Sequence, residues 1–256
     1  MILSKTKLSL YSRLSSRKQR EKLGLFIAEG EKCVSDTHKF FTVEAIIVLE
    51  KDALRFENLY QHPIFTVTES EMRALSQFQS LPSIIAVYKL PAPLQCENED
   101  FSKGLTLMLD AVQDPGNLGT ILRIASWFGV SRVVLGTGCA DPFNPKAIQS
   151  SMGAIGMIRI YQCDLLPIIN SNPDIPVCGT LLDGTDIYTT PLSLPAFVVM
   201  GNEGNGLSNE LRQTVNQPLL IPCFASGPHA ESLNVAAATA ITVSEFMRRH
   251  PQEPIS

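Results

Sequence analysis

Residues 1–90 alternate between short apolar runs and segments in which apolar positions have helical spacing. The apolar runs have the length and residue types of β-strands, and they cover 25–28, 43–49, 64–68 and 84–90. Helical spacing covers 52–61 and 70–77, with Ser70 as the expected N-cap of the second segment. Leu8, Tyr11 and Leu14 lie on one face of a further helix. Strands and helices in this order predict a small α/β unit.

The second part of the chain has the pattern of a parallel α/β sheet. The continuous apolar run at 105–109 is typical of a strand buried on both faces. Further strands are expected at 132–135, 157–161, 177–182, 197–200 and 219–221. Helices are expected at 118–128, 145–155 and 232–248, the last with Ser232 as its N-cap.

A stretch rich in proline and acidic residues separates the two patterns. Residues 91–100 carry two prolines and three acids without any periodicity, which is the composition of a linker. We therefore predict a first domain over 1–92, a linker over 93–104 and a second domain over 105–256.

Composition narrows the class of protein. Hydrophobic residues make up 45% of the chain and charged residues 18%, which excludes a disordered chain, a coiled-coil rod and a collagen-like repeat. No signal peptide and no apolar run long enough to cross a bilayer is present, so we expect a cytoplasmic protein with no membrane partner. The six cysteines are far apart and form no C-x-x-C pair. They are expected to be reduced thiols, and no metal site is predicted.

The net charge of −4 hides a strong asymmetry. Residues 1–95 hold 13 Lys and Arg against 10 Asp and Glu, whereas 96–256 hold 8 against 15. A basic end on an acidic protein indicates an interaction region, with RNA phosphates as one candidate partner and a solvated basic helix face as the alternative. The candidate RNA-binding residues are Arg13, Arg17, Lys18, Arg20 and Lys22.

Three clusters of unusual residues follow predicted strands, at the sheet edge where open α/β folds bind ligands. The first holds Asn117, Gly119 and Arg123 at the start of a helix, where backbone N–H groups favour an anion; an ordinary capped helix with a solvated arginine is the alternative. The second, 201–208, is glycine-rich but is neither a Walker loop nor a dinucleotide fingerprint. The third runs from 221 to an Ala-rich helix.

Taken together and in order, these clusters resemble the three motifs of a known family. The motifs are Asn117-x-Gly119-x-x-x-Arg123, then Gly201-Asn-Glu203-Gly204-x-Gly206-Leu-Ser, then Ile221-Pro followed by Ser232-Leu-Asn234-Val-Ala. They are similar to those of the SpoU/TrmH family of RNA ribose 2′-O-methyltransferases in the SPOUT superfamily, and the resemblance covers 105–250. Residues 20–30 resemble a substrate-binding domain related to kink-turn-binding ribosomal proteins.

The resemblance implies several properties. The fold would be a small α/β RNA-binding domain followed by a SPOUT-type parallel sheet with a trefoil knot. The cofactor would be S-adenosylmethionine, bent in the knot and held by backbone groups. The protein would be a homodimer, with the helices at 118–128 and 232–248 as candidate interface. The substrate would be structured RNA, with ribosomal RNA favoured over transfer RNA.

The same resemblance assigns site residues. Those expected to bind the cofactor are Thr180, Leu181, Met200, Gly201, Asn202, Gly206, Ile221 and Leu233. Those expected to take part in catalysis are Arg123, Asn117, Glu203, Ser232 and Asn234.

Chemistry suggests a role for each catalytic candidate. A guanidinium does not release its proton, so Arg123 would stabilise the developing alkoxide rather than act as the base. Asn117 would orient Arg123 or the ribose, and Glu203 would hold Arg123 or face the positive sulfonium. Ser232 and Asn234 would hydrogen-bond the nucleotide or the polar end of the cofactor. The base is left unassigned, with His229 either a candidate or a solvated loop residue.

Two other functions stay open at this stage. One is a catalytically silent RNA-binding dimer that keeps the fold as a scaffold. The other is an enzyme that methylates a base nitrogen on the same fold. The presence of Asn117, Arg123, Glu203 and Asn234 favours an active enzyme, and the Ser232-Leu-Asn234 motif favours the ribose.

Overall fold

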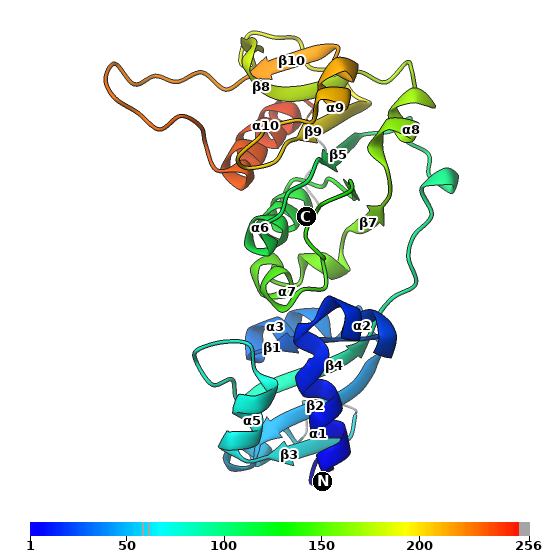
Figure 1. The fold of residues 1–256 in the computed structure, drawn as a ribbon, viewed down its shortest axis with the longest axis vertical. Helices are drawn as coiled ribbons and strands as arrows, with labels where there is room; N and C mark the ends of the chain where they lie inside the picture. Colours follow the sequence, from blue (N-terminus) through cyan, green and yellow to red (C-terminus); the bar gives the residue numbers. More distant parts are fainter. Residues whose placement is uncertain (58, 61, 251–256) are drawn as a thin grey trace. The chain divides into compact units, whose positions relative to one another are not determined.

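The computed structural model describes residues 1–57, 59–60 and 62–250, which form two compact units (Figure 1). The first unit contains Met1–Ala92 together with Asp141–Gly156. The second contains Pro93–Ala140 and the chain from Met157 onward. Compactness therefore groups 141–156 with the first unit, although this segment falls inside the methyltransferase domain predicted at 105–256. The boundaries predicted from the family resemblance stay a proposal.

A four-stranded sheet of mixed direction organises the first unit (Figure 1). Its order is β1-β4-β2-β3, with β4 antiparallel to both neighbours and β2 parallel to β3. The strands are β1 (Leu25–Glu29), β2 (Val43–Leu49), β3 (Ile64–Val67) and β4 (Ile84–Lys89). The helices are α1 (Lys5–Tyr11), η1 (Ser12–Ser15), α2 (Arg17–Leu23), α3 (Glu31–Thr37), η2 (Glu50–Asp52), α4 (Ala53–Phe56), α5 (Glu69–Leu75), α7 (Pro145–Ser151) and η4 (Ala154–Gly156).

Alternate residues of β1 serve the two faces of this sheet. Ile27 belongs to the core that Tyr11 and Leu14 also fill, beneath α1 and η1. Its neighbour Phe26 points to the other face, where its ring lies 4.9 Å from that of Phe143. The period of two predicted for this strand thus supplies both halves of the core.

Two expected helices of the first unit begin or end differently. The helix expected at 70–77 is Glu69–Leu75, and its N-cap is Thr68 rather than Ser70. Thr68 prevails because the Glu71 carboxylate accepts a hydrogen bond from its backbone N–H, which completes a capping box. The helix expected at 52–61 is confined to Ala53–Phe56, and positions 58 and 61 of that expectation lie outside the described residues.

The second unit is built on a six-stranded sheet in which every pair of neighbours is parallel. The order is β10-β8-β9-β5-β6-β7, which confirms the predicted parallel α/β fold. The strands are β5 (Leu105–Leu109), β6 (Arg132–Leu135), β7 (Arg159–Gln162), β8 (Val177–Asp186), β9 (Ala196–Met200) and β10 (Gln217–Leu220). The helices are η3 (Cys96–Asn98), α6 (Pro115–Trp127), α8 (Leu165–Asn170), α9 (Asn209–Thr214) and α10 (Val235–Arg249).

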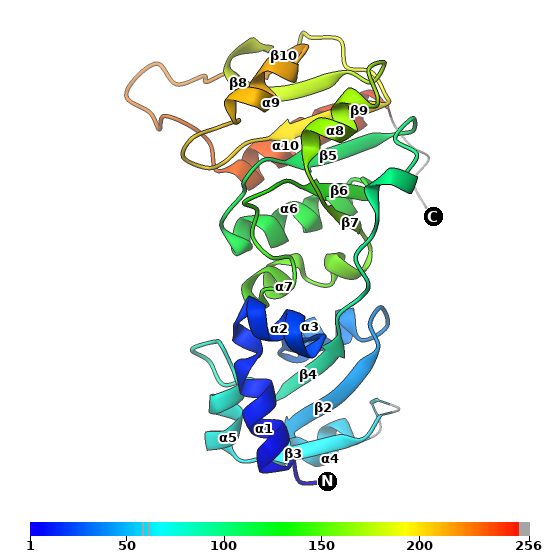
Figure 2. The same cartoon turned by 45° about the vertical axis from the view of Figure 1, so that its right-hand side comes forward.

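Helices cover both faces of this sheet. Leu165, Ile168 and Leu211 of α8 and α9 pack into one core with Met108 and Val199. Helices α6 and α10 lie side by side on the other face (Figures 1 and 2). Strand β5 lies between β9 and β6 and is buried at every position, as its continuous apolar run predicts. No helix among the described residues is both long and apolar enough to span a membrane.

Two helices that lead to the site also begin at unexpected residues. Helix α6 starts at Pro115, three residues before the expected Leu118, because Asp114 caps it and proline is suited to the first turn. Helix α10 starts at Val235 with Asn234 as N-cap. Ser232 is therefore not the cap and lies exposed in the preceding loop.

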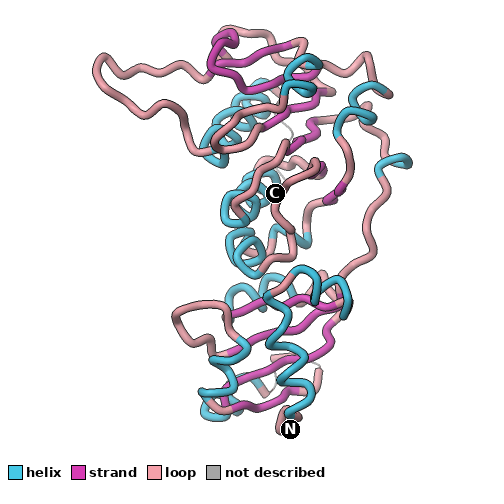
Figure 3. Tube along the Cα trace, viewed as in Figure 1, coloured by secondary structure: helices cyan, strands magenta, loops and turns pink. Residues whose placement is uncertain are grey.

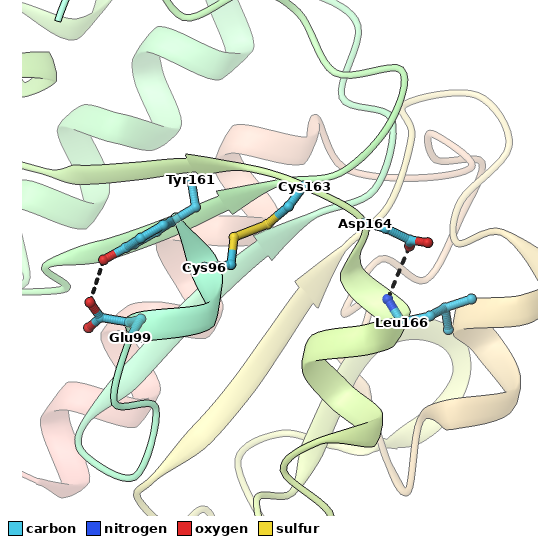
Figure 4. The surroundings of a disulfide bond; sticks show 6 residues. All are labelled: Cys96, Glu99, Tyr161, Cys163, Asp164 and Leu166. Atoms are coloured by element: carbon cyan, nitrogen blue, oxygen red, sulfur yellow. Dashed lines mark hydrogen bonds between the residues drawn. A yellow bond between two sulfur atoms is a disulfide. The ribbon is translucent and has the colours of Figure 1, made fainter. Parts of the chain in front are cut away.

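A disulfide joins Cys96 to Cys163, so the expectation that all six cysteines are reduced is wrong (Figure 4). The bond fastens the segment before β5 to the end of β7, the edge strand. Glu99 of the same segment accepts hydrogen bonds from Arg132, Arg159 and Tyr161. Burial, and then the contact with Glu99, raises the pKa of Tyr161 to about 12. The predicted linker is thus tied to the second unit.

Reduction of this disulfide should destabilise the protein. Its two cysteines are 67 residues apart in sequence. The bond restricts the unfolded chain, so breaking it raises the entropy of that chain and lowers the free energy of unfolding by about 2–4 kcal/mol. Urea unfolding with and without reductant would measure the effect. The Cys96→Ser/Cys163→Ser variant is the control and should not respond to reductant. A wild-type midpoint that reductant leaves unchanged would contradict the prediction.

The end of α10 is anchored by a buried carboxylate. Glu245 accepts hydrogen bonds from Arg248 and Arg249. Arg249 also donates to the carbonyl oxygens of Ile187 and Tyr188, just after β8. The bond from Arg248 and then that from Arg249, opposed by burial, lower the pKa of Glu245 to about 2.

The stabilising effect of Glu245 should therefore disappear in acid. Its folded pKa of about 2 lies below the ordinary value of 4.5, so the contribution is complete above pH 4.5 and is lost as the pH falls towards 2. Glu245→Gln should lower the unfolding midpoint at pH 7, and its difference from wild type should narrow over that range. Glu231→Gln, in an exposed loop, removes the same charge as a control. A constant difference at all pH values would count against the ion pair.

Candidate active site

Two of the three sequence clusters are joined where β5 and β9 end. These strands are parallel neighbours, so the loops that follow them leave the same edge of the sheet. The Asp110 N–H donates to the Met200 carbonyl oxygen over 2.9 Å, and the Asp110 carboxylate accepts the Ser208 N–H over 2.6 Å. The Asn202 side chain donates to the Ala111 carbonyl oxygen over 2.8 Å. The glycine-rich loop is therefore held firmly against the loop that leads into α6.

The glycine-rich loop is a tight hairpin. Asn202 and Gly206 exchange two backbone hydrogen bonds of 2.9 and 3.0 Å. A Cβ atom at Gly201 would lie 2.4 Å from the carbonyl carbon of Gly206, so no larger residue fits there. Gly206 has a φ of 68°, in the left-handed region that favours glycine. The close approach at Gly201 joins the two arms of the hairpin, whereas nothing lies within 4 Å of the position of a Cβ atom at Gly206, where the backbone is open to a ligand.

Asn117 connects all three clusters. Its side-chain N–H donates to Glu203 over 3.0 Å, and its side-chain oxygen accepts from the Asn234 amide over 3.0 Å. The Asn234 oxygen in turn accepts the Ala236 and Ala237 N–H groups at the start of α10. Residues 86 and 117 positions away from Asn117 in the sequence therefore meet at one side chain.

The ends of this chain of hydrogen bonds determine its direction. A carboxylate can only accept, so Asn117 must turn its N–H group towards Glu203. Free N–H groups of a helix can only donate, so Asn234 must turn its oxygen towards α10. Each asparagine has one acceptor and one donor group, and each uses both. An aspartate at position 117 would place two carboxylates face to face.

Glu203 is ionised within this arrangement. Partial burial opposes ionisation, but hydrogen bonds from Asn117 and from backbone N–H groups, including those of Gln113 and Asp114, outweigh it and lower the pKa of Glu203. Its negative charge is thus stabilised by donors of the α6 loop. Of the two roles expected for Glu203, the contact with Arg123 is not made in this structure.

Arg123 is exposed on α6 and keeps its guanidinium free. Over residues 1–57, 59–60 and 62–250, the structure gives it no hydrogen bond and no ion pair. Asn117 is occupied by Glu203 and Asn234, so it does not orient Arg123 here. A permanently charged side chain without a partner is available to a substrate oxygen.

Several predicted cofactor residues lie on or just after adjacent strands. The Thr180 hydroxyl lies 3.7 Å from the sulfur of Met200, so it links β8, just after the stretch that pairs with β9, to the last residue of β9. Leu181 packs against the core and Ile221 follows β10, the neighbour of β8. Leu181 and Ile221 are apolar, as the site of an adenine ring requires, and their assignment to the cofactor stays a prediction.

The third cluster brings only Asn234 into the hydrogen-bonded network. Residues 221–234 form one long loop without helix or strand (Figure 3). Ser232 and Leu233 are exposed in it, as is His229, whose ring Nδ1 lies 2.8 Å from the Ala230 carbonyl oxygen. The loop therefore holds its predicted site residues open to solvent.

One residue of the site was not predicted. Asp110 joins the α6 loop to the glycine-rich hairpin through Ser208, and the next residue, Ala111, has a φ of 53°. The sequence signal is an acid directly after a buried strand, at the edge where such sheets bind ligands.

Comparison with known proteins decides the family. The model of the SpoU rRNA Methylase family matches residues 104–244. The chain belongs to the SpoU rRNA methylase family. The model of the MRM3-like substrate binding domain matches residues 6–86. Both resemblances inferred from the sequence are confirmed, and the matched region contains Asn117, Glu203 and Asn234.

Relatives of this SpoU family member are similar over almost the whole chain. The 23S rRNA (guanosine(2553)-2′-O)-methyltransferase RlmP of Bacillus subtilis is 32% identical over 238 residues, which cover 91% of this chain and 92% of that protein. A Porphyromonas gingivalis structure assigned to the TrmH family of RNA methyltransferases has a TM-score of 0.84 and 38% identity, covering 97% of this chain and 100% of that one. The AdoMet-bound rRNA methyltransferase of Sinorhizobium meliloti has a TM-score of 0.83 and 26% identity, covering 98% of each chain.

Proposed function

We propose that this protein transfers a methyl group from S-adenosylmethionine to a ribose 2′-hydroxyl of ribosomal RNA. The observation that carries the proposal is the network centred on Asn117, which unites the three family motifs with correctly placed donors and acceptors. Relatives similar over nine-tenths of the chain are named as enzymes of this activity. An active enzyme uses this network, whereas a scaffold does not require it.

The reaction makes three demands on the protein. The 2′-hydroxyl must lose its proton, its oxygen must lie in line with the methyl group, and the negative charge on that oxygen must be stabilised. The cofactor, when bound, supplies a methyl group activated by a positive sulfur. The open backbone at Gly206 and the apolar Leu181, Met200 and Ile221 would position it.

Arg123 would meet the electrostatic demand. Its free guanidinium would donate to the 2′-oxygen as negative charge develops there. It would not be the base, because a guanidinium keeps its protons. The base stays unassigned; His229, exposed in the 221–234 loop with its Nδ1 2.8 Å from the Ala230 carbonyl oxygen, is one candidate. Ser232 would contact the nucleotide from the same loop.

The finer properties of the proposal rest on family resemblance. They are the trefoil knot, the homodimer and the cytoplasmic location. The preference for ribosomal RNA over transfer RNA as substrate rests on the same resemblance. The dimer would pair α6 and α10 with their copies. In support, Trp127 at the end of α6 is 83% exposed, although a large apolar ring is costly in water.

Transfer of labelled methyl groups from S-adenosylmethionine tests the proposal. Ribosomal RNA that lacks the modification should accept label, and nucleoside analysis should locate it on a ribose. Label on a base would favour the base methyltransferase. Absence of transfer, together with no calorimetric binding of S-adenosylhomocysteine, would favour the silent scaffold. Light scattering of the purified protein measures the dimer separately.

A further inference from the structure

A hollow of about 440 Å³ opens on the first unit. Helix α1, the turn η1 and helix α2 surround it. The residues that line it are Thr6, Ser9, Leu10, Arg13, Gln19, Lys22 and Leu23. The sequence analysis predicts no site formed by these residues together, although it includes Arg13 and Lys22 among the RNA-binding candidates.

The lining has the chemistry of a site for an anion attached to an apolar group. Arg13 and Lys22 bring two positive charges, and no acidic residue lines the hollow. The nearby acid, Glu21, is paired with Arg17 at 2.8 Å, outside the hollow. Leu10 and Leu23 contribute apolar surface beside these charges. The hollow is therefore electropositive on one side and apolar on another.

Arg13 is held in place but keeps capacity for a ligand. One of its terminal nitrogens lies 3.4 Å from the Ser9 hydroxyl, one turn earlier along the chain. A guanidinium has five N–H donors, so most remain free for other acceptors. Both Arg13 and Lys22 are exposed, so RNA can reach them.

The wall of the hollow is fixed by Arg20, which corrects one prediction. Arg20 is only 2% exposed and donates to the carbonyl oxygens of Leu14 and Ser15 over 2.7 and 2.8 Å. It also pairs with Asp141 of the same unit. A buried guanidinium with these partners cannot bind phosphate. Arg20 is instead a positioning residue that locks the turn between η1 and α2.

We propose that this hollow binds one unpaired nucleotide of the RNA substrate. Its phosphate would lie between Arg13 and Lys22, and its base would lie against Leu10 and Leu23. This inference rests on the proposed function and extends it by naming where the first unit grips the RNA. The volume falls within the range of sites that enclose small ligands. A hollow favours an extruded nucleotide over the flat face of a duplex, because only an unpaired base can enter it.

The exposed cations outside the hollow provide a matched control. Lys5 on α1 and Lys39 just after α3 are exposed and do not line the hollow. The variant Arg13→Ala/Lys22→Ala and the control Lys5→Ala/Lys39→Ala remove the same charge from the same unit. Affinity of each full-length protein would be measured for a ribosomal RNA fragment with an unpaired loop and for a perfect duplex, at several salt concentrations.

Arg13→Ala/Lys22→Ala should weaken binding of the looped fragment by about tenfold or more, and lower the slope of log K against log salt by about 0.7, the value for one phosphate of a single strand. The control should change the affinity by less than about threefold, as expected of cations that make no fixed phosphate contact. Equal losses in the two variants would overturn the proposal, because the basic face would then act as a diffuse field. An RNA affinity of Arg13→Ala/Lys22→Ala equal to that of wild type would also overturn the proposal. An acidic protein would then be the favoured ligand of the hollow.

A third variant tests the hollow apart from its charge. Leu10→Trp should fill the space, reduce the preference for the looped fragment over the duplex, and keep the salt slope. An unchanged preference would count against a nucleotide in the hollow. The circular dichroism spectrum and the unfolding midpoint of each variant check that the first unit is folded, and S-adenosylhomocysteine binding checks the second unit. If wild type binds RNA and transfers methyl groups, and the hollow variants bind RNA as tightly as wild type, only this inference fails. If wild type transfers no methyl groups, the proposed function fails.

Discussion

Arg123→Ala should lower kcat of methyl transfer by about a thousandfold, which is the size of effect seen when a fixed donor to a developing oxyanion is removed. The guanidinium is exposed and makes no hydrogen bond or ion pair within the described residues, so its loss removes no polar interaction from the fold. Binding of S-adenosylhomocysteine should therefore stay close to the wild-type value. Single-turnover transfer and calorimetry on the same preparation would separate chemistry from cofactor binding.

Arg123→Lys is the matched control for this prediction. It keeps the positive charge but lacks the planar group with several donors, so it should recover part of the lost rate. Arg212, an exposed arginine of the second unit, pairs with Asp183, and Arg212→Ala should leave the rate near wild type. Full activity in Arg123→Ala would refute the electrostatic role.

Asn117→Asp should reduce the rate by about tenfold to a hundredfold, because it replaces a donor to Glu203 with a second carboxylate. Two carboxylates at 3.0 Å cannot both ionise without repulsion, so one must take up a proton or the loop must move. Residual activity of Asn117→Asp should therefore rise as the pH is lowered, relative to wild type. The pH dependence of single-turnover transfer would measure this.

A compensating change separates this explanation from simple damage to the fold. Glu203→Gln in the Asn117→Asp background restores one donor and one acceptor between the two positions. The double variant should regain a large part of the rate and lose the abnormal pH dependence. If Glu203→Gln adds a further, independent loss instead, the hydrogen-bonded pair does not control activity.

The fold could largely be predicted because its signals are local. The continuous apolar run of β5 predicts burial on both faces, and the structure buries all its residues. Helix starts were less accurate: Thr68 and Asn234 cap the helices for which Ser70 and Ser232 were expected. Several residues near each start could serve as a cap, and contacts decide among them, such as the return bond from Glu71.

The disulfide and the role of Arg20 could not be predicted, for a common reason. Cys96 and Cys163 are 67 residues apart, and only the pairing of a segment with an edge strand makes them neighbours. Arg20 has the sequence context of a surface cation, and only the packing of 141–156 on the first unit buries it against Asp141. The local sequence around a residue does not show which distant residues will become its neighbours when the chain packs.

The sequence by itself determined the family, the parallel sheet and the residue types of the site, because spacing within each motif is local information. Tertiary structure alone decided how those residues are used. It joined Asn117 to Glu203 and Asn234, left Arg123 free, and turned Arg20 inward. Hydrogen-bond partners far apart in the chain meet only when strands and helices pack, so their pairing belongs to the fold and not to any one segment.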